Sequence, residues 1–217
     1  MSLHLASHLR QAVLALGVAA VFGASAATTD AQFVPAFQQF QAAQTGDADA
    51  LGGAAEQFNT LLKADPANPT LLAYAGAATA LKSKTTVMPW KKMSYAEDGL
   101  AQIDKALALL QPVHDAELLN HVPLSLQTRF VAASTFLGLP PFFNRGPRGA
   151  KLLGDVQASP LFAQSPLGFQ GAVLMRAAQL AAAEHRVDDA RRNYTQVIDR
   201  AMPQADAAKA QREGLPQ

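Results

Sequence analysis

The chain consists mainly of alanine- and leucine-rich segments of helical length, separated by short turns that contain proline, glycine or aspartate. Such segments constrain the fold strongly, because alanine and leucine favour helix and long β-branched runs are scarce. Phe33, Phe37 and Phe40, for example, are spaced three and four residues apart, which places them on one face of a helix. The segments predict an all-α fold with helices near residues 31–44, 48–64, 71–82, 94–111, 115–137, 150–157, 166–185 and 187–202.

Residues 1–26 have the features of a secretory signal peptide. Arg10 precedes an apolar run at residues 12–22, and Ala24 and Ala26 form a small-residue cleavage site. The run is shorter than the roughly 20 residues that cross a bilayer, so an uncleaved anchor is the less favoured alternative. We therefore predict cleavage after Ala26, export through the Sec pathway to the periplasm, and no membrane span in the mature chain.

The charge balance and the lack of cysteine exclude several classes of function. The chain has 18 lysines and arginines, 17 aspartates and glutamates, and no cysteine. Removal of residues 1–26 takes away Arg10 and no acidic residue, which leaves a balanced chain and argues against non-specific binding of nucleic acid. Without cysteine there are no disulfides, thiolate catalysis, iron–sulfur clusters or cysteine-based zinc sites, and we expect no cofactor.

Two stretches repeat a pattern of large and small residues on consecutive helices. The first consists of Leu72, Ala75, Gly76, Gly99, Ile103 and Ala106, with Pro112 closing the unit. The second consists of Leu174, Ala177, Ala178, Ala181, Ala190 and Tyr194, with Pro203 at its end. Small residues allow two antiparallel helices to approach closely, and large residues fill the groove between neighbouring pairs.

This pattern resembles the tetratricopeptide repeat, and residues 61–78 (LLKADPANPTLLAYAGAA) and 182–203 (AAEHRVDDARRNYTQVIDRAMP) carry the resemblance best. The resemblance implies four antiparallel helix pairs over residues 27–203, stacked as a right-handed superhelix. Residues 204–217 are then expected to form a flexible tail. The match is incomplete, because residues 115–157 fit only as a helical hairpin. An irregular all-α bundle is the alternative.

A repeat array of this kind exposes a concave face formed by the first helix of each pair. The resemblance implies that this face binds a peptide, an extended segment or another subunit. We expect it to include Tyr74, Thr79, Gln127, Arg129, Gln170 and Arg176.

Residues 82–95 (KSKTTVMPWKKMSY) interrupt the second repeat between its two helices, and we interpret them as an insertion at that turn. They contain Trp90, the only tryptophan of the chain. Tryptophan and methionine are favoured at recognition surfaces, so Trp90, with Lys91 and Lys92 beside it, is a candidate contact. The favoured alternative is a long connection folded back on its own repeat, with Trp90 buried.

A possible metal site lies at the start of the predicted helix over residues 115–137. His114, Glu117 and His121 are three and four apart, so on a helix they would share one face and could hold a metal ion. The favoured alternative is that the acids near Pro112 stabilise a helix start and that His121 fills a kink near Pro123. We therefore predict no metal, with these three residues as weak candidates.

A possible anion site lies in residues 144–151 (NRGPRGAK), where Arg145, Arg148 and Lys151 surround two glycines just before a helix start. Helix starts attract anions, so a phosphate or carboxylate could bind there. The favoured alternative is a basic loop that holds its own neighbours.

The chain shows no serine–histidine–aspartate order and no paired carboxylates that stand out, so we do not expect an enzyme. The first hypothesis is a non-enzymatic periplasmic adaptor or scaffold in a transport, secretion or cell-wall assembly, with a protein or peptide of the cell envelope as its partner. The alternative is a periplasmic carrier that holds a small molecule or a metal in a pocket between helices, near Phe142, Phe143 and Arg145.

Overall fold

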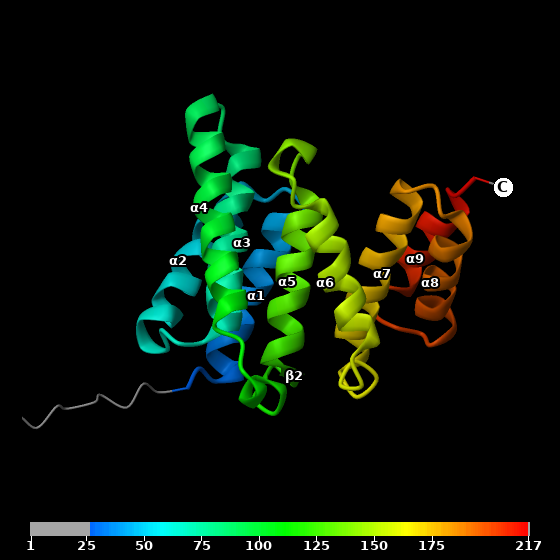
Figure 1. The fold of residues 1–217 in the computed structure, drawn as a ribbon, viewed down its shortest axis with the longest axis horizontal. Coiled ribbons are helices and arrows are strands. Elements are labelled where there is room, and N and C mark those ends of the chain that lie inside the picture. Colours follow the sequence, from blue (N-terminus) through cyan, green and yellow to red (C-terminus); the bar gives the residue numbers. More distant parts are fainter. Residues whose placement is uncertain (1–26, 217) are drawn as a thin grey trace, which may run out of the picture.

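The computed structural model describes residues 27–216, and Figure 1 shows that they are almost entirely helical. The nine helices of this part of the chain are α1 (Asp30–Gln44), α2 (Ala48–Ala64), α3 (Pro69–Thr85), α4 (Pro89–Ala108), α5 (Leu124–Gly138), α6 (Gly146–Ala158), α7 (Leu167–Ala183), α8 (Val187–Asp199) and α9 (Ala205–Glu213). The predicted all-α class is confirmed. The predicted signal peptide, residues 1–26, lies outside the described residues.

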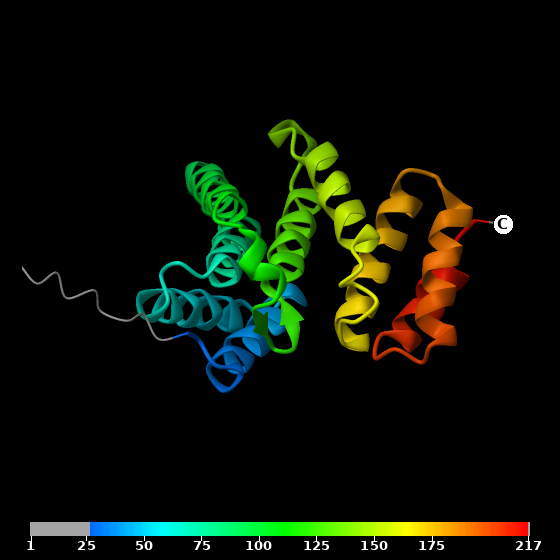
Figure 2. The same ribbon diagram turned by 60° about the horizontal axis from the view of Figure 1, so that its bottom comes forward.

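Consecutive helices pack against each other in pairs along the chain. Helix α1 packs on α2, α3 on α4, α5 on α6 and α7 on α8, while α9 lies against α8. Helices α3 and α5 also touch, which joins the second pair to the third. Figure 2 shows the pairs following one another from the N-terminal to the C-terminal end of the molecule, so most packing is local in sequence.

The α3–α4 pair depends on two glycines that face each other. A Cβ atom on Gly76 would lie 2.8 Å from the carbonyl oxygen of Gly99, and one on Gly99 would lie 2.5 Å from the carbonyl oxygen of Gly76. Neither distance leaves room for a side chain. The two backbones can therefore approach this closely only because both residues are glycine. Ile103 and Ala106 are buried beside them. The small positions of the first repeat pattern therefore mark a close helix contact, as predicted.

The core of the first two pairs is centred on the ring of Tyr74. This ring stacks on Phe58 with centroids 5.0 Å apart, and it meets Phe40 and Phe33 edge-on at 5.3 and 5.5 Å. All four side chains are buried, so α1, α2 and α3 are held together by one aromatic cluster.

Two helix starts are capped as their sequence suggests. The Asp47 carboxylate accepts a hydrogen bond from the N–H of Ala50 at 2.9 Å at the start of α2. The Asn68 side-chain oxygen accepts two N–H groups of the first turn of α3, at 3.1 and 3.2 Å. Pro69 follows at the first helical position, where its missing N–H costs nothing.

The prediction of one helix over residues 115–137 is wrong in its first part. This part contains a 3₁₀ helix η1 (Pro112–Asp115) and a hairpin of β1 (Leu118–Leu119) and β2 (Val122–Pro123), and α5 begins only after it. Asn120 and His121 have φ values of 51° and 61°, which suit a two-residue hairpin turn and are incompatible with a helix. Pro123 then ends the hairpin and precedes the first turn of α5, so it separates two elements rather than kinking one.

The interpretation of residues 82–95 as an insertion at a turn is also wrong. Helix α3 continues to Thr85 and α4 begins at Pro89, so only three residues connect the two helices. Pro89 occupies the first turn of α4, where proline is well tolerated, and the residues after it continue the helix. Both helices are therefore longer than predicted, and their joined ends form the uppermost part of the molecule in Figure 1.

Residues 204–217, expected as a flexible tail, instead contain helix α9. Ala208 of α9 is buried, and the Tyr194 hydroxyl donates a hydrogen bond to the Gln211 side-chain oxygen at 2.8 Å. The chain reverses direction before α9 at Ala201, whose φ is 47°. Helix α9 therefore covers the side of α8 that would otherwise end the row of pairs.

Candidate functional site

A pocket of about 520 Å³ opens between α1, α3, α5 and α7, which are the first helices of the four pairs. Its apolar lining consists of Phe37, Phe40, Tyr74, Ala77, Ala80, Leu81, Phe130, Val131, Gly138, Leu139, Ala172 and Met175. Its polar lining consists of Gln41, Gln44, Lys84, Ser134, Thr135, Arg176 and Gln179. We call this feature the groove. It contains two cations and no aspartate, glutamate or histidine among the described residues that line it.

The floor of the groove is aromatic and uncharged. Tyr74 forms part of it and belongs to the aromatic cluster of the first two pairs. The Gln127 side-chain N–H donates to the Tyr74 hydroxyl oxygen at 3.2 Å, and both side chains are buried. Burial raises the pKa of Tyr74 above its usual range, although the hydrogen bond from Gln127 opposes this, so the phenol stays neutral. A ligand in the groove therefore meets an apolar aromatic surface beneath it.

The two cations converge beside Gly138 at the end of α5. A Cβ atom at Gly138 would lie 3.8 Å from Arg176 Nη2 and 3.8 Å from Lys84 Nζ. Because glycine places no side chain there, the space between the two charges stays open. Within the described residues, neither Arg176 nor Lys84 forms an ion pair with a carboxylate.

Arg176 is incompletely satisfied by the protein. Its Nη2 donates to the backbone oxygen of Ser134 at 3.1 Å, but its Nε is buried and has no hydrogen-bond partner in the described chain. The Ser134 hydroxyl beside it is buried and also lacks a partner there. Burial lowers the pKa of Arg176, because the guanidinium has lost water without gaining a carboxylate. An anion bound here would supply what the guanidinium lacks.

Side-chain amides surround the cationic end of the groove. Within the described residues, Gln41 and Gln44 of α1 form no side-chain hydrogen bond, whereas Gln179 of α7 donates to Gln211 of α9 at 3.2 Å. Thr135 bonds back to the Val131 carbonyl of its own helix at 2.9 Å. Donors and acceptors thus remain available at the rim while the floor stays apolar.

The structure brings together only part of the predicted concave face. Tyr74 and Arg176 both line the groove, whereas Thr79 and Arg129 are not part of its lining. Gln127 lies behind Tyr74, and its amide supports the floor. Gln170 is buried elsewhere: its amide N–H donates to the Ser165 carbonyl at 2.6 Å and its oxygen accepts from Arg200 at 2.7 Å, so it has a structural role.

Arg145 and Arg148, the predicted anion-binding residues, both bind one aspartate of the protein itself. Arg145 Nη2 lies 2.9 Å from Asp104 Oδ2, and Arg148 Nη1 lies 2.5 Å from Asp104 Oδ1. Both guanidinium groups also lie over the ring of Phe136, at 5.4 and 5.3 Å from its centroid. This geometry agrees with the alternative of a basic loop that holds its own neighbours, here linking the start of α6 to α4.

The three weak metal candidates lie around the β hairpin rather than on one helix face. His114 Nδ1 accepts the Gln111 N–H at 2.9 Å, and its Nε2 lies 3.9 Å from the Glu117 carboxylate. His121, at the hairpin turn, lies 3.9 Å from the Asp30 carboxylate instead. Nowhere in residues 27–216 do three histidine, aspartate or glutamate side chains gather so as to hold a metal ion. The helical spacing on which this hypothesis depended is absent.

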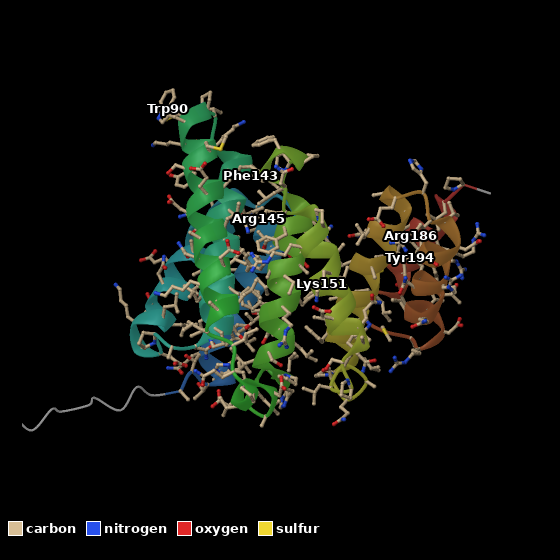
Figure 3. The ribbon with its side chains drawn as sticks, viewed as in Figure 1. Trp90, Phe143, Arg145, Lys151, Arg186 and Tyr194 are labelled. Atoms are coloured by element: carbon tan, nitrogen blue, oxygen red, sulfur yellow. The ribbon has the colours of Figure 1, made fainter. Side chains whose placement is uncertain are left out.

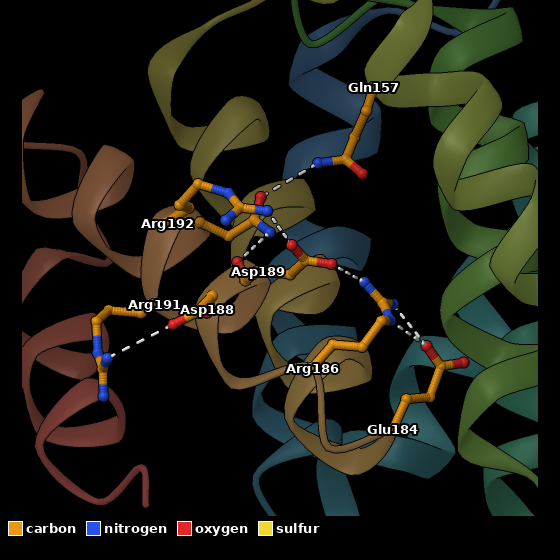
Figure 4. Close-up of polar contacts among 8 residues, drawn as sticks. Gln157, Glu184, Arg186, Asp188, Asp189, Arg191 and Arg192 are labelled. Carbon is orange, nitrogen blue, oxygen red and sulfur yellow. Dashed lines mark hydrogen bonds and ion pairs between the residues drawn. The ribbon is translucent and has the colours of Figure 1, made fainter. Parts of the chain in front are cut away.

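A second pocket, of about 330 Å³, lies between α6, α7 and α8, and its charges are paired with one another. Arg186 contacts Glu184 and Asp189 at 2.5 Å each, and Arg192 pairs with Asp189 as well (Figure 4). The hydrogen bonds that Arg186 donates, first to Glu184 and then to Asp189, raise the pKa of Arg186. The cluster is therefore a salt-bridge network at a helix start, and the groove is the stronger candidate site.

Trp90, Lys91 and Lys92 lie on the first turn of α4, at the joined ends of α3 and α4, and do not line the groove. Trp90 is 69% exposed, so it is not buried in its own repeat (Figure 3). Reasoning from the sequence missed the groove residues Lys84 and Gly138. Lys84 falls in residues 82–95, interpreted from the sequence as an insertion, and only the fold places it on α3 near Arg176 of α7.

Comparisons with protein-family models, curated proteins and solved structures find no match to this chain. No helix within the described residues is long and apolar enough to cross a membrane. A function must therefore be inferred from the groove and from the exposed surface of the helices.

Proposed function

We propose that the protein is a non-enzymatic periplasmic adaptor whose groove binds an extended, acidic segment of a partner protein in a cell-envelope assembly. The observation that carries this proposal is the pair of cations, Arg176 and Lys84, at the rim of an apolar groove without acidic residues. A carboxylate between them would form charge-assisted hydrogen bonds, which are about twice as strong as neutral ones. Apolar side chains next to that carboxylate would cover the floor around Tyr74.

The proposal also includes how the helix pairs stack on one another. The helices follow one another in contacting pairs, and the first helices of the pairs share the groove. This arrangement supports a tetratricopeptide-like right-handed superhelix, in which an extended segment lies along the inner helices. The close meeting of Gly76 and Gly99 supports the same interpretation, since the repeat places small residues at such contacts.

The absence of catalytic groups from the lining supports a binding role. A nucleophile such as the Ser134 hydroxyl needs a general base within hydrogen-bond reach. The described residues that line the groove include no histidine or carboxylate to serve as that base. The groove can therefore hold and orient a ligand, but it has no side chains of its own for proton transfer near neutral pH.

Photo-crosslinking tests the proposal directly. A photoreactive amino acid replaces Gln44 or Thr135 at the rim of the groove, and Glu56 on the exposed side of α2 in the control. After irradiation of intact cells that make the protein, we expect the rim variants to form a crosslink to one polypeptide. Mass spectrometry should identify an acidic segment of it, and the added substitution Arg176→Gln should abolish the crosslink. The same crosslink from position 56 would contradict binding in the groove.

A carrier for a small organic anion is the second candidate, because about 520 Å³ is within the range of small-molecule sites. In that case the rim variants crosslink to no polypeptide. A carboxylate-bearing metabolite would instead raise the melting temperature, and the increase would grow with ligand concentration. The two candidates therefore give opposite results in the same pair of measurements.

A further inference from the structure

Large apolar side chains are exposed where α3 and α4 join. We call residues 86–93 the α4 tip. Val87 is 87% exposed and Trp90 is 69% exposed, and Met88 and Met93 are exposed beside them. Tryptophan is usually mostly buried, so such a concentration within seven residues indicates an interaction surface.

The α4 tip is also strongly basic. Lys91 and Lys92 lie on it and Lys82 lies on the last turn of α3, and none of the three forms an ion pair in the described chain. The first acidic residue beyond them is Glu97, seven positions after Trp90. That spacing places it roughly 10 Å farther along the helix axis. The positive charge at the tip is therefore not neutralised locally.

The α4 tip is a protrusion rather than a hollow. The joined ends of α3 and α4 project beyond the neighbouring helices, and Trp90 lies at their end (Figures 1 and 3). The short 3₁₀ helix η2 (Pro141–Phe143) between α5 and α6 lies at the same end of the molecule in both ribbon views. Its Phe142 is 64% exposed. Two neighbouring helix connections at this end of the molecule thus each carry an exposed aromatic side chain.

We propose that the α4 tip docks the protein on an anionic lipid surface. Trp90, with Val87 and Met88, would enter the headgroup region, which tryptophan favours because its ring is amphipathic. Lys91 and Lys92 would bind lipid phosphates while their aliphatic stems lie along the apolar residues. A protein partner fits less well, because lysine is depleted at protein–protein interfaces and charged residues are depleted from their cores.

The fluorescence of Trp90 provides a specific test, because it is the only tryptophan in the chain. The full chain is titrated with vesicles of phosphatidylcholine and phosphatidylglycerol, and in parallel with vesicles of phosphatidylcholine alone. With the anionic vesicles we expect a blue shift of the emission, protection from acrylamide, and quenching by brominated lipids. Other residues of the chain could also bind the vesicles, but all variants share those residues. The fluorescence of Trp90 changes only if the α4 tip itself enters the lipid.

Charge reversal supplies the matched comparison. The double variant Lys91→Glu, Lys92→Glu should lower the partition coefficient onto anionic vesicles roughly thirtyfold or more. Each lysine near an anionic surface raises that coefficient about fivefold, and glutamate adds repulsion. The control Lys151→Glu, Lys209→Glu changes the net charge equally at positions outside the tip and should behave like the parent chain. An unchanged Trp90 spectrum with anionic vesicles would overturn the proposal. So would an equal response to neutral vesicles, or a shift caused only by an added envelope protein.

Discussion

Arg176 lowers the stability of the unliganded protein, and the proposed function gives it a role in binding an anion. Its guanidinium is partly buried, its Nε has no hydrogen-bond partner among the described residues, and it forms no ion pair there. Glycine at position 138 leaves the neighbouring space open. A buried donor without a partner costs free energy in the unliganded protein, and a bound anion would remove that cost. The arrangement therefore supports the proposal that Arg176 binds an anionic group.

Substitution of Arg176 by methionine separates these two roles. Methionine keeps the apolar stem and removes the unsatisfied guanidinium, so Arg176→Met should raise the free energy of unfolding by about 1 kcal/mol. Urea denaturation measures this change. The same variant should lose the photo-crosslink at the groove rim, whereas the control Arg129→Met should retain it. A less stable Arg176→Met protein would indicate that the contact with the Ser134 carbonyl, not a ligand, keeps the arginine in place.

Tyr74 should make stability depend on alkaline pH. In an unfolded chain tyrosine ionises near pH 10, whereas burial raises the pKa of Tyr74 in the folded protein. The folded state therefore keeps its proton to higher pH than the unfolded state. The contribution of Tyr74 to the unfolding free energy is fully present below about pH 10 and is lost as the pH rises further.

Replacement of Tyr74 by phenylalanine tests this dependence. Near neutral pH, Tyr74→Phe should cost about 1 kcal/mol, because Gln127 loses the acceptor of its buried hydrogen bond. Between about pH 10 and pH 11.5, however, its unfolding free energy should fall less steeply than that of the parent chain. Urea titrations over this range provide the measurement, with Tyr95→Phe as a variant that removes a tyrosine outside the core. Parallel slopes for Tyr74→Phe and the parent would contradict the expectation.

At the scale of elements, the helix pairs depend on where backbones can meet. The contact between Gly76 and Gly99 allows α3 and α4 to run together over much of their length. A methyl group at Gly76 would meet a backbone oxygen rather than a flexible side chain, so the clash cannot be relieved locally. The α3–α4 pair, which also carries the α4 tip, is therefore sensitive to a single added carbon atom.

Alanine at Gly76 should destabilise the protein by about 1–3 kcal/mol through overpacking. Gly52 provides the matched control, because it lies within α2 and a Cβ atom there would meet nothing within 4 Å. Gly52→Ala should instead stabilise the protein by about 0.5–1 kcal/mol, since alanine is the better helix former. Thermal and urea unfolding measure whether each substitution raises or lowers the free energy of unfolding. Similar effects at both sites would rule out close backbone contact at Gly76.

The sequence predicted the helices well where the signal is local. Phe33, Phe37 and Phe40 marked α1, and the predicted range 48–64 matches α2, because periodicity and capping depend on residues a few positions apart. Proline was harder to interpret. Pro89 begins a helix, whereas Pro123 separates a hairpin from a helix, and the difference depends on how each neighbouring segment packs. The hairpin turn at Asn120 lacked a glycine that would have revealed it.

At the scale of the whole molecule, the groove joins residues from four helices that are far apart in the chain. Arg176 could be singled out as a lone cation in an apolar helix, and Tyr74 as part of the repeat pattern. Lys84 could not be singled out from the sequence, because its distance from Arg176 depends on how α3, α5 and α7 are arranged. Helix periodicity identifies the face of each helix, but not which faces meet.

Deletion of residues 204–217 should lower the unfolding free energy by a few kcal/mol. The deletion removes α9, exposes Met202 and the surroundings of Tyr194, and leaves the last pair without a cover. Urea denaturation measures the loss, and deletion of residues 215–217 alone serves as the control. Equal stability of the two shortened chains would mean that α9 adds nothing to the fold.

The position of α9 also bears on how copies of this protein behave in concentrated solution. A row of helix pairs that ended at α8 would present an apolar face to the first helices of another copy. Such head-to-tail stacking does not close on itself, so it would lengthen into filaments. Helix α9 covers that face and carries the exposed Asp206 and Lys209 instead. Helix α9 therefore covers an apolar surface on which another copy could otherwise stack.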